Sequence, residues 1–275
     1  RKKRSPAPEV DGVFQKMGEW LTRIYETLRN RIELSPDIRR VYSDLVTPET
    51  AVEQRARSRG ENFGAKPRQP GDDVQSVYNA VEGAQGDFNS WADNVASELG
   101  AREVKSRPQL KDQGRVQEKI TKDGDAPNEV LDIDAKTFVF DTPDQALTAF
   151  DDLVQRPEVK RAKNRMGRAI NTGYRDISLN VEMPNGAIEE VQINTPQMLN
   201  AKDEIGHTLY EIQRSIRDLN VESEAVASQK DKLDLVLRDA QRKLYSAAWD
   251  ASLRDASFSA WDLDIGNELA SISEA

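Results

Sequence analysis

The chain has 275 residues, a net charge of -9 and no cysteine. A chain of this length buries a core without covalent cross-links, and the missing thiols exclude disulfides, thiolate catalysis and cysteine-ligated zinc. The acidic charge argues against DNA as a partner, and the lack of a membrane-length apolar run or a signal peptide predicts a soluble, cytoplasmic protein without a membrane partner.

Helices are predicted at the beginning of the chain. Apolar residues recur at three- and four-residue steps from Val10 to Leu28, and a second apolar series follows Ser35. We interpret residues 1–54 as a helical extension that packs on the main domain, with an interaction or membrane-surface helix as the alternative. The next segment, 55–73, is rich in Arg, Gly and Pro and predicts a flexible linker.

A long helix and a basic segment come next. Helical periodicity resumes at Val74 and continues to Leu99. In LKDQGRVQEK, Lys111, Arg115 and Lys119 follow one another at steps of four, so a helix would carry all three charges on one face. Such a face is typical of a solvated surface or of an anion site.

The stretch VLDIDAKTFVF predicts a largely buried strand, with Asp132 and Asp134 at its beginning. A carboxylate that enters a core strand is costly to bury unless it is paired or binds a cation, which makes Asp132 a candidate magnesium ligand. A capped helix is predicted from Thr142 and Pro143. Together with the segment that follows, these elements predict a mixed α/β core.

A basic cluster precedes an aromatic residue. Its members are Lys160, Arg161, Lys163, Arg165 and Arg168. Phosphates attract such a cluster, and an exposed ring at Tyr174 offers a face on which a base can stack.

Residues 173–195 alternate apolar and polar side chains on both sides of a Pro-Asn-Gly turn, which predicts a β-hairpin. Its polar residues could hold a metal and a charged substrate: Tyr174, Arg175, Glu190 and Gln192. A helix is predicted after Thr195, and it contains His207, the single histidine. The rest, 216–275, is interpreted as a helical C-terminal extension.

Four separated motifs occur in an order that resembles the synthetase domain of RelA/SpoT-like proteins, which transfer pyrophosphate from ATP to the 3′-hydroxyl of a guanine nucleotide. The motifs are the segment with Lys111 and Lys119, LDIDAKTFVF, GYRDISLNV and EVQINT. The resemblance covers about residues 105–211 within a predicted domain of 74–215, and is greatest to versions embedded in phage or mobile-element proteins and to toxic small alarmone synthetases. It implies an α+β fold with a mixed sheet of about five strands flanked by helices.

The resemblance also implies the site. Asp132 and Glu190 would bind Mg²⁺, Glu190 would activate the attacking hydroxyl, and His207 would take part in catalysis. The implied substrate-binding residues are Lys111, Arg115 and Lys119 for ATP, and Lys163, Arg165, Tyr174, Arg175 and Gln192 around the acceptor.

Two positions depart from the family pattern. The arginine of EVQIRT is Asn194 here, and the histidine after the GYRS segment is Ser178. The two acids remain, so we expect an altered enzyme whose acceptor choice differs. One histidine is too few for the family's hydrolase domain, so a synthetase without hydrolase is predicted.

Three functions stay open. The preferred one is transfer to GDP or GTP, which yields guanosine tetra- or pentaphosphate. A toxin of the same fold, acting on adenine nucleotides or the tRNA 3′ end in a bacterial or phage-infected cell, is the second. A non-catalytic module that binds a partner through residues 10–28 is the third.

Overall fold

The computed structural model describes residues 49–220 and 224–263. From Val52 onward, the described residues form a compact unit that is separate from the unit before it. The helices predicted before residue 49 lie outside the described residues. Within the described ranges, no helix combines the length and the apolar character needed to cross a membrane.

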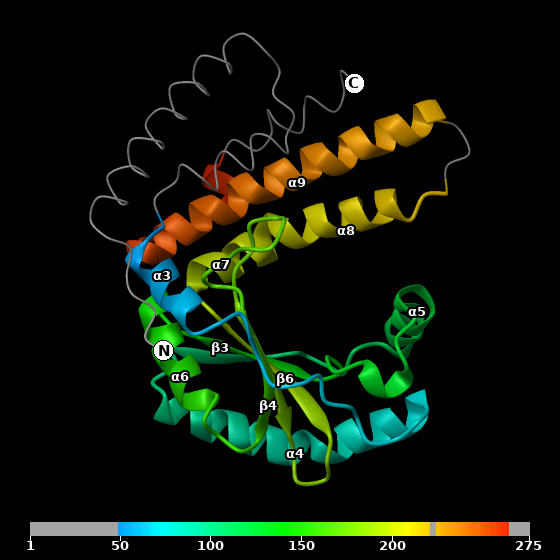
Figure 1. Cartoon of the computed structure of the whole chain (residues 1–275), viewed down its shortest axis with the longest axis vertical. Coiled ribbons are helices and arrows are strands. Elements are labelled where there is room, and N and C mark those ends of the chain that lie inside the picture. The colour runs from blue at the N-terminus through cyan, green and yellow to red at the C-terminus, as the bar shows by residue number, and fades with distance from the viewer. Residues whose placement is uncertain (1–48, 221–223, 264–275) are drawn as a thin grey trace, which may run out of the picture. The chain divides into compact units, whose positions relative to one another are not determined.

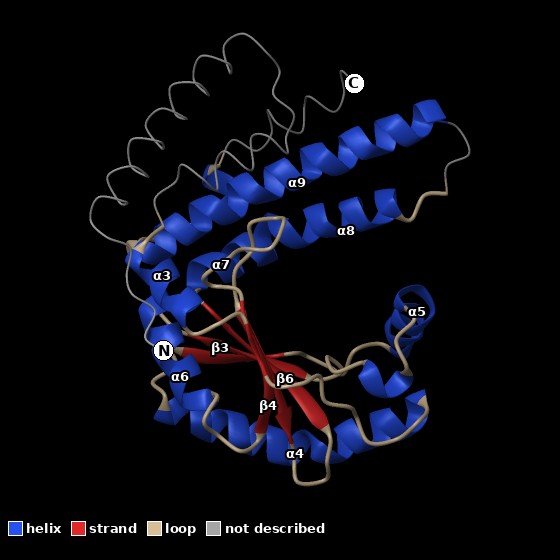
Figure 2. Ribbon diagram, in the orientation of Figure 1, coloured by secondary structure: helices blue, strands red, loops and turns tan. Residues whose placement is uncertain are grey.

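Helices flank a central sheet (Figures 1 and 2). The helices are α3 (Ala51–Ser58), α4 (Val74–Glu98), α5 (Gln113–Asp123), α6 (Pro143–Leu153), α7 (Pro196–Ala201), α8 (His207–Arg217) and α9 (Glu224–Leu253), with a π-helical turn at Lys202–Gly206 and 3-10 turns at Pro127–Glu129 and Ala260–Asp262. The strands are β1 (Asn62–Phe63), β2 (Glu103–Ser106), β3 (Ala135–Val139), β4 (Val159–Asn164), β5 (Ile177–Glu182) and β6 (Ile188–Asn194). The predicted α+β class with a mixed sheet is confirmed.

Within residues 49–220 and 224–263, the sheet has six strands in the order β1-β4-β5-β6-β3-β2. Only β3 and β6 pair in parallel; the other neighbours are antiparallel. The predicted hairpin is β5 and β6, and Gly186 takes the positive φ of 84° that its turn requires. Of the two acids implied by the motifs, Glu190 therefore lies on β6 and Asp132 lies in the loop just before β3, the strand that pairs with β6 in parallel.

Helices α4 and α6 both contact β6. The predicted start of α4 is correct: Asp73 accepts a hydrogen bond from the Ser76 backbone and forms a capping box with it. Phe88 of α4 and Ile193 of β6 are both fully buried in the resulting core. Figure 1 shows α4 on the side of the sheet away from α8 and α9. One sheet face is thereby closed by apolar packing.

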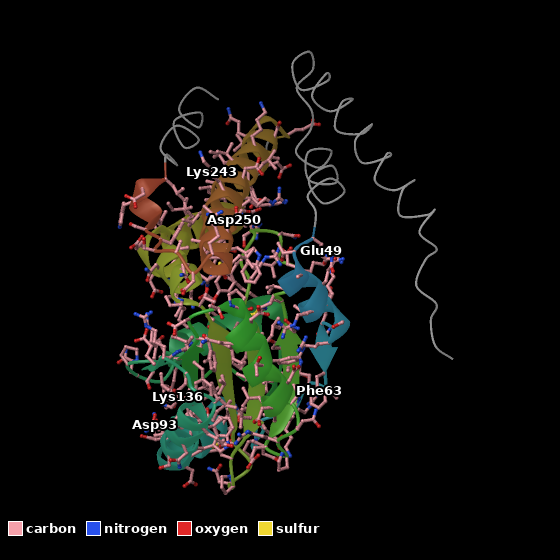
Figure 3. The ribbon with its side chains drawn as sticks, turned by 90° about the vertical axis from the view of Figure 1, so that its left-hand side faces the viewer. Glu49, Phe63, Asp93, Lys136, Lys243 and Asp250 are labelled. Carbon is pink, nitrogen blue, oxygen red and sulfur yellow. The ribbon has the colours of Figure 1, made fainter. Side chains whose placement is uncertain are left out.

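The segment 55–73 is not the flexible linker that its composition predicts. It contains the end of α3 and the edge strand β1, whose Phe63 pairs with Ala162 of β4 (Figure 3). Gln69 is 3% exposed and bonds to both the N–H and the C=O of Ile188. The sequence shows no periodic hydrophobic pattern for a strand of two residues or for a side chain that bonds a distant backbone. The prediction therefore rested on composition alone and was wrong.

Helix α9 belongs to the same compact unit as the sheet. Tyr245 and Trp249 of α9 are buried in the main core, and α9 packs along α7 and α8. The described residues of the predicted helical C-terminal extension therefore pack as part of the same body as the sheet. The basic cluster of 160–168 also differs from a simple surface cluster, because its first half is strand β4.

Candidate functional site

One face of the sheet carries a row of polar side chains. In the strand register, Lys163 of β4 lies opposite Ser178 of β5, which lies opposite Gln192 of β6. Glu190 points to the same face because alternate residues of a strand share a face. We call this group of four residues the polar face.

Glu190 is held by two of its neighbours. Ser178 Oγ donates to Glu190 Oε1 at 2.9 Å, and Gln192 Nε2 donates to Glu190 Oε2 at 3.2 Å. Burial and the nearby charge of Asp132 raise the pKa of Glu190, although both hydrogen bonds work in the opposite direction. The carboxylate is thus fixed in orientation and repelled by a second acid, a state that a bound cation would relieve.

Asp132 is the second acid, and two lysines hold it. Lys111 Nζ lies 2.5 Å from Asp132 Oδ2, and Lys119 Nζ lies 3.2 Å from Asp132 Oδ1. Burial works to raise the pKa of Asp132, but the hydrogen bond from Lys111 and the charges of both lysines outweigh it, so the pKa is lowered. Asp132 therefore stays ionised between two cations.

The three basic residues predicted on one helix face are arranged differently. Lys111 precedes α5, whose first turn is capped by Asp112. The backbone carbonyl of Lys111 accepts a hydrogen bond from the Tyr78 hydroxyl. Lys119 lies on α5 and reaches the same carboxylate. Arg115 instead contacts Glu118 at 3.3 Å. The helix begins only after Asp112, because the Asp112 side chain accepts a hydrogen bond from the free N–H of Arg115 and so caps the first turn. Lys111 therefore lies outside the helix.

Asp134 does not join Asp132. It is 7% exposed, accepts a hydrogen bond from the Ala135 N–H and lines a cavity of about 440 Å³. Lys136 and Asp93 of α4, which line the same cavity, are labelled in Figure 3. The two acids therefore lie in different surroundings: the Asp134 carbonyl accepts a hydrogen bond from the Glu190 N–H at 3.2 Å, but of the two carboxylates only that of Asp132 raises the pKa of Glu190.

Lys163 remains available on the polar face. Burial, together with the charges of Arg161, Arg165 and Lys66, lowers its pKa. Its ammonium group makes no hydrogen bond or ion pair with another residue in the described part of the chain. An anion placed beside Lys163 would offset both the desolvation and the repulsion.

Two predicted substrate-binding arginines are already engaged. Arg165 forms a two-bond ion pair with Asp176, whose carboxylate is buried. Arg175 lies 2.5 Å from Glu53 and stacks 4.7 Å above the Trp249 ring. Sequence proximity placed both beside the substrate, but each folds back on an acid or a ring that comes from elsewhere in the chain.

Tyr174 is not the exposed ring that the sequence predicts. It is half-buried, its hydroxyl accepts a bond from Asn194 Nδ2 at 2.7 Å, and its ring meets Tyr245 edge-on at 5.1 Å. Asn194, one of the two departures from the family pattern, thus bonds directly to the predicted stacking residue. Nothing in the sequence pointed to Tyr245, which lies within an ordinary apolar helix pattern.

His207 is exposed at the first position of α8. No contact joins it to Asp132 or Glu190, so the structure does not bring it into the cluster. Across residues 49–220 and 224–263, no group of three or more His, Asp or Glu side chains is arranged to hold a metal by itself.

No family model matches the chain. The (p)ppApp synthetase toxin Tas1 of Pseudomonas aeruginosa (strain UCBPP-PA14) is 28% identical over 131 residues, which cover 47% of this chain and 28% of that protein. The match thus spans less than a third of the relative's length. The resemblance to alarmone-type synthetases that the motifs indicated is confirmed by this relative.

Two solved structures align with about two thirds of this chain. The crystal structure of the complex between the Type VI effector Tas1 and its immunity protein aligns with a TM-score of 0.49 and 24% identity, covering 64% of this chain and 96% of that one. The small alarmone synthetase 1 from Bacillus subtilis, bound to its product pppGpp, aligns with a TM-score of 0.47 and 17% identity, covering 63% and 91%.

Proposed function

We propose that this chain is a synthetase that transfers pyrophosphate from ATP to the 3′-hydroxyl of a purine nucleotide. One observation supports it above the others: two acids, Glu190 on β6 and Asp132 in the loop before the parallel strand β3, are each held by two neighbouring side chains, and the charge of Asp132 helps to raise the pKa of Glu190. The motif order and the curated relative add to it.

The donor site would lie around Asp132. Lys111 and Lys119 now pair with this carboxylate, and both would turn to the ATP phosphates when a cation takes their place. Arg115 lies one turn before Lys119 on α5 and would serve the outer phosphates. Positioning and neutralisation of polyanions account for most of the rate in such transfers.

Asp132 and Glu190 fit a Mg²⁺ site of the kind that uses one or two carboxylates and completes its coordination with substrate phosphates and water. When bound, Mg²⁺ would neutralise charge on the ATP phosphates.

The acceptor would occupy the remainder of the polar face. Lys163 would bind its phosphates, and the Tyr174 ring would contact its base. The acceptor 3′-oxygen attacks the β-phosphorus of ATP. The bond from that phosphorus to the oxygen that bridges the α- and β-phosphates breaks, and AMP leaves. Glu190, oriented by Ser178 and Gln192, takes the hydroxyl proton.

Two acceptor classes compete. Guanine nucleotides follow from the motifs, while adenine nucleotides are favoured by the relative, which is a (p)ppApp synthetase toxin. The second class would make this chain a toxin that acts in a bacterial cytoplasm. The tRNA 3′ end belongs to the same adenine class.

Incubation with γ-labelled ATP, Mg²⁺ and each acceptor in turn tests the proposal. GDP, GTP, ADP, ATP and tRNA are the acceptors, and the parent should label at least one of them. Glu190→Gln should lower the turnover number by roughly a hundredfold or more, as expected when a positioned base is removed.

Glu189→Gln is the matched control, because it makes the same change one residue away in the same strand. Glu189 is fully buried on the opposite, apolar face and should leave transfer unchanged. The proposal fails if no acceptor is labelled, or if Glu190→Gln is as active as Glu189→Gln.

A further inference from the structure

We propose that Tyr245 of α9 is a positioning residue for the acceptor: together with Asn194, it holds the Tyr174 ring where the acceptor base binds. This inference rests on the proposed function, because that function assigns Tyr174 to the base. It gives α9, which lies outside the segment 105–211 that carries the family motifs, a part in substrate selection.

Tyr174 is held at its hydroxyl and at its ring. Asn194 Nδ2 donates to the hydroxyl at 2.7 Å, and the Tyr245 ring meets it at 5.1 Å with an interplanar angle of 68°. Edge-to-face contacts of this kind favour one relative orientation of the rings. The two neighbours together leave Tyr174 little rotational freedom.

The orientation of the Asn194 amide is itself determined. Its Oδ1 accepts a hydrogen bond from the Thr195 N–H at 3.0 Å, so Nδ2 is the atom that faces Tyr174. Asn194 is fully buried. It therefore acts on a substrate through Tyr174 and not by direct contact, which differs from the role expected of an arginine at this position.

The loop before Tyr174 is docked on α9. Gly173 has a φ of 87°, and a side chain there would come within 3.2 Å of the Arg242 Cα and 3.4 Å of the Tyr245 Cβ. Arg242 Nε also donates to the Asn171 carbonyl at 2.8 Å. Loop and helix thus approach closely enough that a side chain at position 173 would crowd α9, and the positive φ also favours glycine there.

The other end of Tyr245 reaches the start of α8. A Cβ at Gly206 would overlap the Tyr245 hydroxyl, so this glycine is required by the contact. Burial raises the pKa of Tyr245 to about 12, and the side chain is 5% exposed. A single neutral, buried ring therefore separates the Tyr174 loop from the turn that precedes His207.

The consequence is specific to the acceptor. The Tyr174 ring is supported by α9, whereas Lys111 and Lys119 at the donor site are held by Asp132. Loss of the Tyr245 ring should therefore weaken acceptor binding without changing donor binding. A purely structural role would not separate the two nucleotides.

Equilibrium binding of GDP, ADP and a non-hydrolysable ATP analogue tests this with three variants. Tyr245→Leu removes the ring and should raise the dissociation constant of the acceptor by roughly fivefold or more, within the range known for aromatic–base stacking. Tyr245→Phe keeps the ring and should restore parental binding. Asn194→Leu leaves Tyr245 intact and should raise the dissociation constant of the acceptor in the same way.

Tyr210→Leu, an exposed position on α8, is the matched control and should bind both nucleotides like the parent. Steady-state kinetics should show a higher KM for the acceptor and an unchanged KM for ATP in Tyr245→Leu. Backbone amides of 165–176 should also exchange faster in that variant, a readout that needs no nucleotide.

The outcomes separate the two proposals. If the parent transfers label while Tyr245→Leu and Asn194→Leu bind the acceptor as it does, this inference is wrong and the proposed function stands. Equal weakening of donor and acceptor would likewise overturn it, since that marks general damage. If the parent neither binds nor labels any acceptor, both proposals are wrong.

Discussion

Glu189 and Glu190 are neighbours in β6 that occupy contrasting environments. Both oxygens of Glu190 accept hydrogen bonds, whereas both oxygens of Glu189 are buried without a partner in the described structure. Burial, aided by the charge of Asp134, raises the pKa of Glu189 to about 8. A carboxyl in such surroundings is stable in its neutral form.

This environment predicts a pH-dependent stability. The unfolded chain releases the Glu189 proton near pH 4.5, while the folded chain keeps it to about pH 8. Rising pH therefore favours unfolding across this window, by up to about 1.4 kcal/mol per pH unit. Urea unfolding at several pH values should show this slope in the parent, and Glu189→Gln should remove most of it.

Glu82→Gln controls for the loss of one negative charge, because Glu82 is exposed on α4. Equal slopes in the parent and in Glu189→Gln would show that Glu189 is ionised, and hence paired, in the folded chain.

Three ion pairs connect helix α5 to α8 and to Asp218, the residue that follows it. The ion pairs are Arg115–Glu211 at 3.8 Å, Glu118–Arg214 at 2.5 Å and Lys122–Asp218 at 2.5 Å. Along each helix the three positions follow at steps of three and four, and their signs alternate in a complementary order. The hydrogen bond from Arg214, followed by that from Lys122, lowers the pKa of Glu118 to about 2.

The connection should be sensitive to salt, because exposed ion pairs are weak and screened. Glu118→Gln removes the central member and should speed hydrogen exchange of the α5 amides at low ionic strength. The difference from the parent should shrink at high salt. Since α5 carries Lys119, the KM for ATP should change in the same variant under the same conditions.

Glu82→Gln again provides the control, as an exposed helical glutamate on α4 without a partner in the described part of the chain. Equal α5 exchange in Glu118→Gln and the parent at low salt would mean that α5 is held by other contacts.

For the whole molecule, the described body should unfold as one unit. Trp249 of α9 is 4% exposed and packs in the core that also contains Phe88 of α4. Trp249→Ala should therefore lower the free energy of unfolding by about 3–5 kcal/mol, and amides of β6 and α9 should lose protection together. Circular dichroism during urea unfolding and hydrogen exchange measure the two effects.

Trp261, at 72% exposure, makes the matched control. Trp261→Ala should stay within about 0.5 kcal/mol of the parent. If Trp249→Ala releases α9 while the sheet keeps its protection, the C-terminal helix unfolds independently of the sheet and the expectation of a single unit is wrong.

The sequence by itself determined the elements whose signals are local. Alternation with Asn185-Gly186 predicts the hairpin, the periodicity from Val74 and the cap at Thr142 mark the starts of α4 and α6, and motif order singles out Asp132 and Glu190. The hairpin and the helix starts depend on residues close together in the chain, where spacing and propensity are sufficient, whereas the two acids were singled out by the order of motifs spread over about residues 105–211.

Tertiary structure alone decided which side chains are free to act. Arg165 and Arg175 are engaged by Asp176 and Glu53, and Tyr174 is held by Asn194 and Tyr245. Except for Asp176, these partners lie 20 or more positions away in the sequence, so no spacing rule connects them. Burial then sets their chemistry, because an ionisable or polar group inside the fold must be paired, neutral or available to a ligand.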